Sequence, residues 1–153
     1  MQDLDPLWVA EFCGLFWGEG SINMQVKDLV YYVDGEERPS FRVTFKFSIG
    51  LRADNLPILR DIKDKLGGHI YKREGGRHYV WVVSKLSLIK KIAALLMSGQ
   101  MPSSKKDELL WLEKAIQFRE TRPRKGANRK VFQAGDKEKF LEFKRNLERC
   151  RKF

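Results

Sequence analysis

The chain has few of the residues on which many secreted proteins and enzymes rely. Its 153 residues include only two cysteines, Cys13 and Cys150, and two histidines, His69 and His78. The two cysteines fit no metal-ligand spacing and cannot build a disulfide framework. The histidines are isolated, so a catalytic triad has no support. We therefore expect a reduced, intracellular protein in which Cys13 is a small core residue.

Long apolar runs are also absent. No stretch approaches the roughly 20 apolar residues that span a bilayer. The N-terminal residues Met-Gln-Asp-Leu-Asp lack the basic and apolar regions of a signal peptide. We expect no membrane partner, and a location in the cytoplasm of a prokaryote or in an organelle.

Acidic residues are the minority among the charged ones. The chain has 30 Lys and Arg against 20 Asp and Glu, a formal net charge of +10. This excess favours a polyanionic partner such as nucleic acid, although a generally solvated basic surface is the alternative. The length and the 42% of hydrophobic residues fit one domain with a real core.

The most informative stretch is a helix that ends in a carboxylate. Asp5-Pro6 is typical of a helix start. The apolar residues that follow lie on more than one face, so the helix should be buried on two sides. Gly14 and Gly18 share one face, and that spacing lets two helix backbones approach closely. Glu19 emerges where this helix ends, and its carboxylate is a natural ligand for a hard divalent cation.

Two strands with alternating residues follow. Ser21 to Lys27 is the first, and Phe41 to Ile49 is the clearest alternation in the chain, with one apolar and one basic face. Asp34 to Pro39 between them predicts a turn or loop. Aromatic residues of the second strand should lie in the core, because they share the face opposite the basic one.

The remaining periodicity predicts three helices and a hairpin. The expected elements are a helix over Asp54–Leu66, strands His69–Arg73 and His78–Val83, a helix over Leu86–Leu96 and a helix from Ser103 or Ser104. Asp107 and Glu108 should stand in the first turn of the last helix, where acids favour the helix dipole. The pattern is α+β, with helices on one face of an antiparallel sheet.

Residues 119–153 form a tail to the expected domain of residues 1–118. A basic linker contains Arg124, Lys125, Arg129 and Lys130, and a short helix over Asp136–Lys152 follows. We expect this helix to dock on the same domain rather than to form a separate DNA-contacting element.

The stretch from Phe12 to Ile22 resembles the signature motif of the LAGLIDADG homing endonucleases, and the element order resembles their αββαββα core. The resemblance implies that Glu19 and the Gly18 carbonyl hold a catalytic Mg²⁺ or another divalent cation such as Mn²⁺. It also implies a homodimer, since the chain has one motif copy, with Phe12, Gly14, Leu15 and Gly18 in the dimer interface. Trp17 stands where the family usually has a polar residue.

The family also has a lysine near the start of the helix after the second hairpin, often in a Pro-containing stretch. Met101 to Lys106 matches it, so Lys105 and Lys106 are both candidate catalytic residues, and Lys105 is favoured. Gly50-Leu51-Arg52 stands where the family often has a polar residue, commonly Gln, and Arg52 is a candidate substitute. By resemblance the protein is an intron-type, site-specific endonuclease. It would cut both strands of a long, near-palindromic DNA target and leave 3′ overhangs.

The outward strand faces would bind the DNA, mostly through phosphate or water-mediated contacts. The candidate residues are Asn23, Gln25, Lys27, Arg42, Thr44, Lys46, Ser48, Lys72, Arg73 and Arg77. A non-cleaving nucleic-acid-binding module on the same fold, either an RNA maturase or a DNA-binding regulator, is the alternative. An unrelated basic structural protein is the third reading, and it leaves Glu19 beside the Gly14/Gly18 face unexplained.

Overall fold

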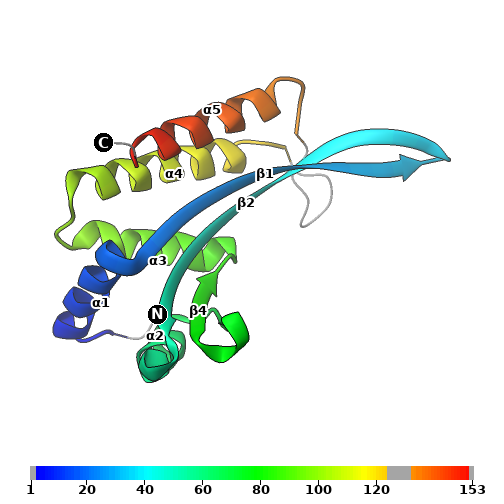
Figure 1. The fold of residues 1–153 in the computed structure, drawn as a ribbon. Helices are drawn as coiled ribbons and strands as arrows, with labels where there is room; N and C mark the ends of the chain where they lie inside the picture. The colour runs from blue at the N-terminus through cyan, green and yellow to red at the C-terminus, as the bar shows by residue number, and fades with distance from the viewer. Residues whose placement is uncertain (1–2, 124–131, 152–153) are drawn as a thin grey trace. The chain divides into compact units, whose positions relative to one another are not determined.

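The chain folds into helices and strands in the order that the sequence predicts (Figure 1). The computed structural model describes residues 3–123 and 132–151. The main elements are α1 (Pro6–Glu19), β1 (Gly20–Val33), β2 (Glu36–Arg52), α2 (Leu56–Leu66), β3 (His69–Arg73), β4 (His78–Val83), α3 (Leu86–Ser98), α4 (Ser103–Glu120) and α5 (Asp136–Arg149). The strands form one sheet in the order β1-β2-β4-β3.

The chain divides into two compact units. The first unit comprises Met1–Asn23 and Phe45–Lys106, and the second comprises Met24–Thr44 and Asp107–Phe153. Segments far apart in the sequence therefore fold together in both units.

The core of the first unit is built from aromatic side chains. Phe16, Phe47 and Trp81 are fully buried. Phe12 meets Trp81 edge to face with ring centroids 6.0 Å apart, and Phe16 meets Phe47 at 5.6 Å. Such edge-to-face pairs stabilise beyond the area that they bury. Cys13 is buried here as predicted, and burial raises the pKa of its thiol.

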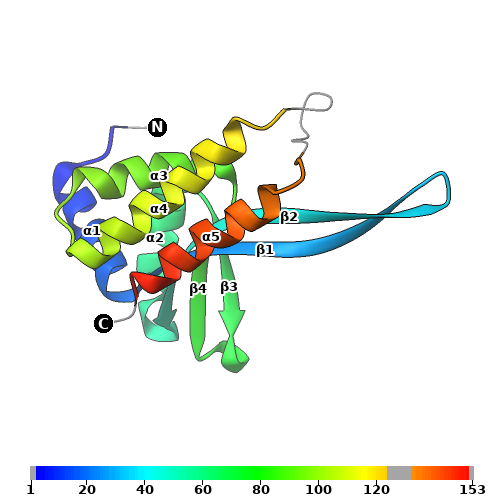
Figure 2. The same ribbon diagram turned by 90° about the horizontal axis from the view of Figure 1, so that it is seen from above.

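The strand register of the first unit separates two faces of the sheet, in which β3 and β4 lie side by side (Figure 2). β2 and β3 both pair antiparallel with β4, and Ile49 lies opposite Trp81, which lies opposite Ile70. Because successive residues of a strand point to opposite faces, Ser48 and its partners lie on the other face.

In the second unit α4 and α5 lie side by side and antiparallel (Figures 1 and 2). Phe118 of α4 packs against Phe140 and Phe143 of α5, with ring centroids 5.1 and 5.8 Å apart. The tail helix α5 thus packs on α4 within the second unit. Arg124, Lys125, Arg129 and Lys130 of the expected basic linker lie outside the described residues.

Two expectations about local structure are wrong. The hairpin is longer than predicted, because only Asp34 and Gly35 form its turn, with φ of 53° and 80°, while Glu36 to Pro39 belong to β2. Positive φ at both central residues is the geometry that closes a two-residue hairpin. Glu108 is not in the first turn of α4; it is 2% exposed and binds Arg151 Nε through its carboxylate at 2.5 Å.

None of the helices in the described part of the chain is both long and apolar enough to cross a membrane.

Candidate active site and nucleic-acid interface

Glu19 is the last residue of α1, and its position follows from how that helix begins and ends. The Asp5 carboxylate caps the helix by accepting from the Leu7 N–H at 3.1 Å, and Pro6 occupies the first turn. The helix ends at Gly20, whose backbone is extended and whose N–H still donates to the Phe16 carbonyl. Glu19 is therefore held at a sharp helix-to-strand junction, with its side chain exposed.

Sequence reasoning gave Gly20 no role, although the junction depends on it. A Cβ at Gly20 would lie 2.4 Å from the Phe16 carbonyl oxygen and 2.6 Å from the Phe16 ring. Both contacts are shorter than van der Waals distance, so any side chain here would displace Phe16, which is fully buried. In the sequence, the signal for this role is that Gly20 directly follows the acidic Glu19 and directly precedes an alternating strand.

Lys105 lies beside the same junction. Its Nζ donates to the Gly20 carbonyl oxygen at 3.3 Å, and its side chain is half-buried. Lys106 is exposed. The fold therefore brings Lys105, at the start of α4, next to the residue that follows Glu19. This geometry distinguishes the two lysines that the sequence left as candidates.

The exposed stripe of α1 carries the two motif glycines. Gly14 and Gly18 are exposed, and a Cβ built on either would meet nothing within 4 Å. Leu7, on the same stripe, is 65% exposed. Phe12, which the resemblance also places in a dimer interface, is instead 3% exposed and packs in the core of the first unit. Glu11 is exposed on the same stripe, between Leu7 and Gly14, so the open surface consists of small and aliphatic residues with one carboxylate.

Trp17 packs at the end of the helix, against Phe16, with ring centroids 5.9 Å apart. Its indole N–H is buried and has no hydrogen-bond partner within the described part of the chain.

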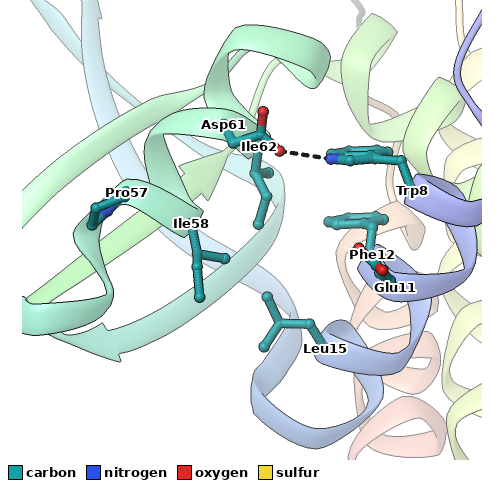
Figure 3. A pocket seen from close by; sticks show the side chains of 8 residues that line it. All are labelled: Trp8, Glu11, Phe12, Leu15, Pro57, Ile58, Asp61 and Ile62. Carbon is teal, nitrogen blue, oxygen red and sulfur yellow. Dashed lines mark hydrogen bonds between the residues drawn. The ribbon is translucent and has the colours of Figure 1, made fainter.

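A pocket of about 470 Å³ opens between α1 and α2 (Figure 3). Its lining is mostly apolar, with Leu15 of α1 and Ile58 of α2 pointing into it. Asp61 accepts from the Trp8 indole N–H at 2.7 Å and from Lys65 Nζ at 2.5 Å. These hydrogen bonds, that of Lys65 above all, hold the pKa of the Asp61 carboxyl below its ordinary value. The bond from Trp8 ties α1 to α2, whereas the bond from Lys65 lies within α2.

The outer face of the sheet in the first unit is basic and includes residues that sequence reasoning missed. Ser48 and His69 both pair with Val82, and Arg52 and Arg73 both pair with His78. All four residues therefore lie on the same face of the sheet. Tyr71 also lies on this face through its pairing with Val80 and Gly50, and it is 54% exposed. In the sequence, the signal for Tyr71 is the alternation of β3, which puts Tyr71 on the face opposite Ile70.

Lys72 does not share that face. It pairs with Tyr79, which pairs with Leu51, so it lies on the side of Trp81 and Ile70. The prediction that Lys72 and Arg73 extend one surface is therefore wrong, because neighbours along a strand point to opposite faces. Arg77, between β3 and β4, is exposed.

The other predicted DNA-facing residues are divided between the units. In the first unit, Asn23 and Lys46 are half-buried. In the second unit, Gln25, Lys27 and Arg42 are exposed and Thr44 is half-buried. Each unit thus presents basic or amide side chains on its strands.

The described part of one chain offers few side chains that could bind a metal ion. Among the described residues there is no group of three or more His, Cys, Asp and Glu side chains that could hold a cation. Glu19 does offer an exposed hard oxygen donor, and Gly18, with an open surface, precedes it. This set fits Mg²⁺, which uses one or two carboxylates and keeps waters and phosphate oxygens as its other ligands.

Comparison with known proteins identifies a family and a fold. A family model described as LAGLIDADG endonuclease matches residues 12–116. No curated protein sequence matches the chain. Several solved structures have the same fold. The I-SmaMI LAGLIDADG homing endonuclease bound to cleaved DNA has a TM-score of 0.72 at 18% identity, over 96% of this chain and 45% of that one.

Two further structures are similar to this chain. I-SmaMI bound to an uncleaved DNA target in the presence of calcium ions has a TM-score of 0.61 at 22% identity, over 78% of this chain and 38% of that one. The LAGLIDADG meganuclease I-AabMI bound to uncleaved DNA has a TM-score of 0.59 at 19% identity, over 72% and 36%. The chain thus spans less than half the length of these proteins.

Proposed function

This chain belongs to the LAGLIDADG endonuclease family, and on that premise we propose that it is a site-specific homing endonuclease which cuts double-stranded DNA as a homodimer. The observation that carries the proposal is the junction at the end of α1. There Glu19, an exposed carboxylate, ends a helix with an open glycine stripe, and the next residue, Gly20, accepts through its carbonyl oxygen from the Lys105 ammonium.

The residues of the junction have distinct roles in phosphodiester hydrolysis. Glu19, with the Gly18 carbonyl, would hold a divalent cation, which when bound activates water and neutralises phosphate charge. Lys105 supplies a fixed positive charge at the same place, which stabilises the negative charge that develops on the phosphate in the transition state. Gly20 lets the chain turn sharply directly after Glu19, and its carbonyl oxygen accepts from Lys105 Nζ.

A second copy of the chain supplies the other half of the site in this proposal. Gly14 and Gly18 leave room for another helix backbone, and Leu7 on the same stripe is exposed. A twofold pairing through α1 brings one Glu19 from each copy to the axis. The greater length of the related DNA-bound proteins supports a working unit of about two such chains.

Two Glu19 carboxylates near a twofold axis would each serve one DNA strand. Such an arrangement produces a double-strand break, and by resemblance the break has 3′ overhangs at a near-palindromic target. The strand residues of each unit would bind the DNA, with Lys46, Arg73 and Tyr71 from the first unit and Lys27 and Arg42 from the second. Phosphate contacts set the register, and any base contacts set the specificity.

The test is to incubate the purified protein with a randomised DNA library, once with Mg²⁺ and once with a chelator, and to sequence the ends. Discrete cuts with 3′ overhangs at a near-palindromic site, only with Mg²⁺, are the expected result. Retention of a defined target without cutting would overturn the nuclease and favour the binding module. A monomer that binds and cuts would overturn the homodimer.

A further inference from the structure

The outer part of the β1–β2 hairpin exposes apolar side chains to an unusual extent. In the second unit, Val30 is 54% exposed and Tyr32 is 71% exposed. A two-stranded ribbon is at best marginally stable by itself. To present the same surface to a target each time, the ribbon therefore needs support from other elements of its unit.

One support is an ion pair between the hairpin and α5. Lys137 Nζ lies 2.6 Å from the Asp28 carboxylate of β1, although 109 positions separate the two residues (137 − 28). Asp28 follows Lys27, a predicted DNA-facing residue, so the two side chains point to opposite faces of the strand. The contact thus reaches the hairpin from the face away from the predicted DNA-binding side.

A second support is a group of stacked rings. Phe132 stacks on Phe41 of β2, with ring centroids 4.6 Å apart and an interplanar angle of 19°. Phe140 of α5 meets both rings edge to face, at 6.1 and 5.4 Å. Phe41 precedes Arg42, another exposed basic residue of the hairpin, and again the two point to opposite faces.

The start of α5 is itself anchored. The Asp136 carboxylate, 5% exposed, accepts from the Gln133 N–H at 2.6 Å and from Arg122 Nη1 at 3.2 Å. Arg122 lies just after α4 and stacks over Phe118 at 4.4 Å. Phe132 and Lys137 are therefore carried by a segment that is fixed to α4.

We propose that the segment from Phe132 through α5 is a brace, which holds the β1–β2 hairpin in the orientation in which it binds DNA. Phe132, Lys137 and Asp28 are then positioning residues for target recognition, and they act through Lys27 and Arg42 without touching the DNA. The recognition role rests on the proposed DNA binding; the bracing of the hairpin itself does not.

Asp28→Asn gives the sharpest test, because the brace and simple electrostatics predict opposite signs. Removing a negative charge from a DNA-binding hairpin should strengthen binding if only net charge matters. Loss of the brace should weaken target binding by about threefold, in line with the free energy of an exposed ion pair. Lys137→Gln should weaken it to a similar extent, and the double variant should be no weaker than Lys137→Gln alone.

Lys144→Gln is the matched control, since Lys144 is a lysine of the same helix that pairs with Glu148 within α5. Phe132→Ala tests the ring stack, with an expected loss of about fivefold in target affinity. In all three brace variants KM for DNA should rise, while kcat at saturating DNA is unchanged. A tighter-binding Asp28→Asn, or a fall in kcat with KM unchanged, would overturn the recognition role.

The mobility of the hairpin gives a readout that needs no DNA. NMR order parameters of the Val30–Val33 amides should fall in Phe132→Ala and Asp28→Asn and stay unchanged in Lys144→Gln. Unchanged order parameters in all variants would overturn the brace. A loosened hairpin in a protein that binds no DNA would leave the brace standing and overturn the proposed function instead.

Discussion

The Lys105 ammonium donates to the carbonyl oxygen of Gly20 at 3.3 Å, across 85 positions of the sequence. Gly20 directly follows Glu19, so this one hydrogen bond brings the candidate catalytic cation to the backbone next to the candidate catalytic residue Glu19. It links the end of α1 to the start of α4 within the first unit. The predictions below begin from this pair.

Replacing Glu19 by Gln should lower the rate of DNA cleavage by at least about 10³-fold, because the side chain loses the charge that holds a cation. DNA binding should persist. Asp64→Asn is the control, since Asp64 is an exposed carboxylate of α2 in the same unit. Single-turnover cleavage and a binding assay in Ca²⁺ check both variants. Full cleavage by Glu19→Gln would remove this residue from the site.

Lys105→Met and Lys106→Met should differ although they are neighbours. Loss of Lys105 should lower kcat by about 10²-fold, because it removes a fixed charge beside the reacting phosphate. Lys106 is exposed, so its loss should affect only DNA affinity, and modestly. Cleavage rates at saturating DNA separate the two effects. Equal falls in kcat would contradict the assignment.

Arg73→Ala and Lys72→Ala remove the same charge from adjacent positions on opposite faces of β3. Arg73→Ala should weaken DNA binding about threefold or more and reduce the slope of log K against log salt by about one. Lys72→Ala should change the DNA affinity and the salt slope much less. Titrations at several salt concentrations measure the difference. The reverse order would mean that the other face of β3 binds the DNA.

Gly14→Leu should disrupt self-association and leave the chain folded. The added side chain meets nothing within one chain, and leucine favours the helix by about 0.8 kcal/mol over glycine. Between two copies it would separate the helices. Ala94→Leu, at an exposed position of α3, is the control. Sedimentation measures the oligomeric state and circular dichroism the fold. A Gly14→Leu dimer would contradict pairing through this stripe.

Asp61 should make stability depend on pH in acid. Its hydrogen bonds hold the carboxyl pKa below the unfolded value, so they stabilise the fold above that value, and the benefit is lost as pH falls through the folded pKa. Asp61→Asn should therefore lower the melting temperature at about pH 7, and the difference should shrink as pH falls below the ordinary carboxyl pKa of 3.8. Asp64→Asn, on the same helix, is the control. A constant difference across this range would contradict the shift.

Element order was largely predictable from local patterns, because apolar spacing reports which face each segment buries. β3 and β4 have the predicted bounds, and α3 begins at the predicted Leu86. The length of the hairpin was not predictable in this way. Its outer residues are exposed on both faces, so Val30 to Val33 show no alternation, and only the positive φ of Asp34 and Gly35 defines the turn.

The parts of the site that depend on distant contacts were harder to predict. The sequence predicts that Glu108 interacts with the helix dipole. Its actual partner, Arg151, lies 43 positions away, and no local pattern indicates that contact. Lys72 was grouped with Arg73 by composition, and only the pairing with β4 separates their faces. The choice between Lys105 and Lys106 likewise needed a contact to Gly20 that no local pattern encodes.

The strict alternation of β2 constrains how such a protein can change its target. Phe45, Phe47 and Ile49 are buried at odd positions, while Lys46 and Ser48 occupy the even ones. A substitution at an even position alters the outer surface and leaves the core intact, whereas a single inserted residue would exchange the two sets. New specificities should therefore accumulate as substitutions along this strand, and changes in length should collect at the Asp34–Gly35 turn.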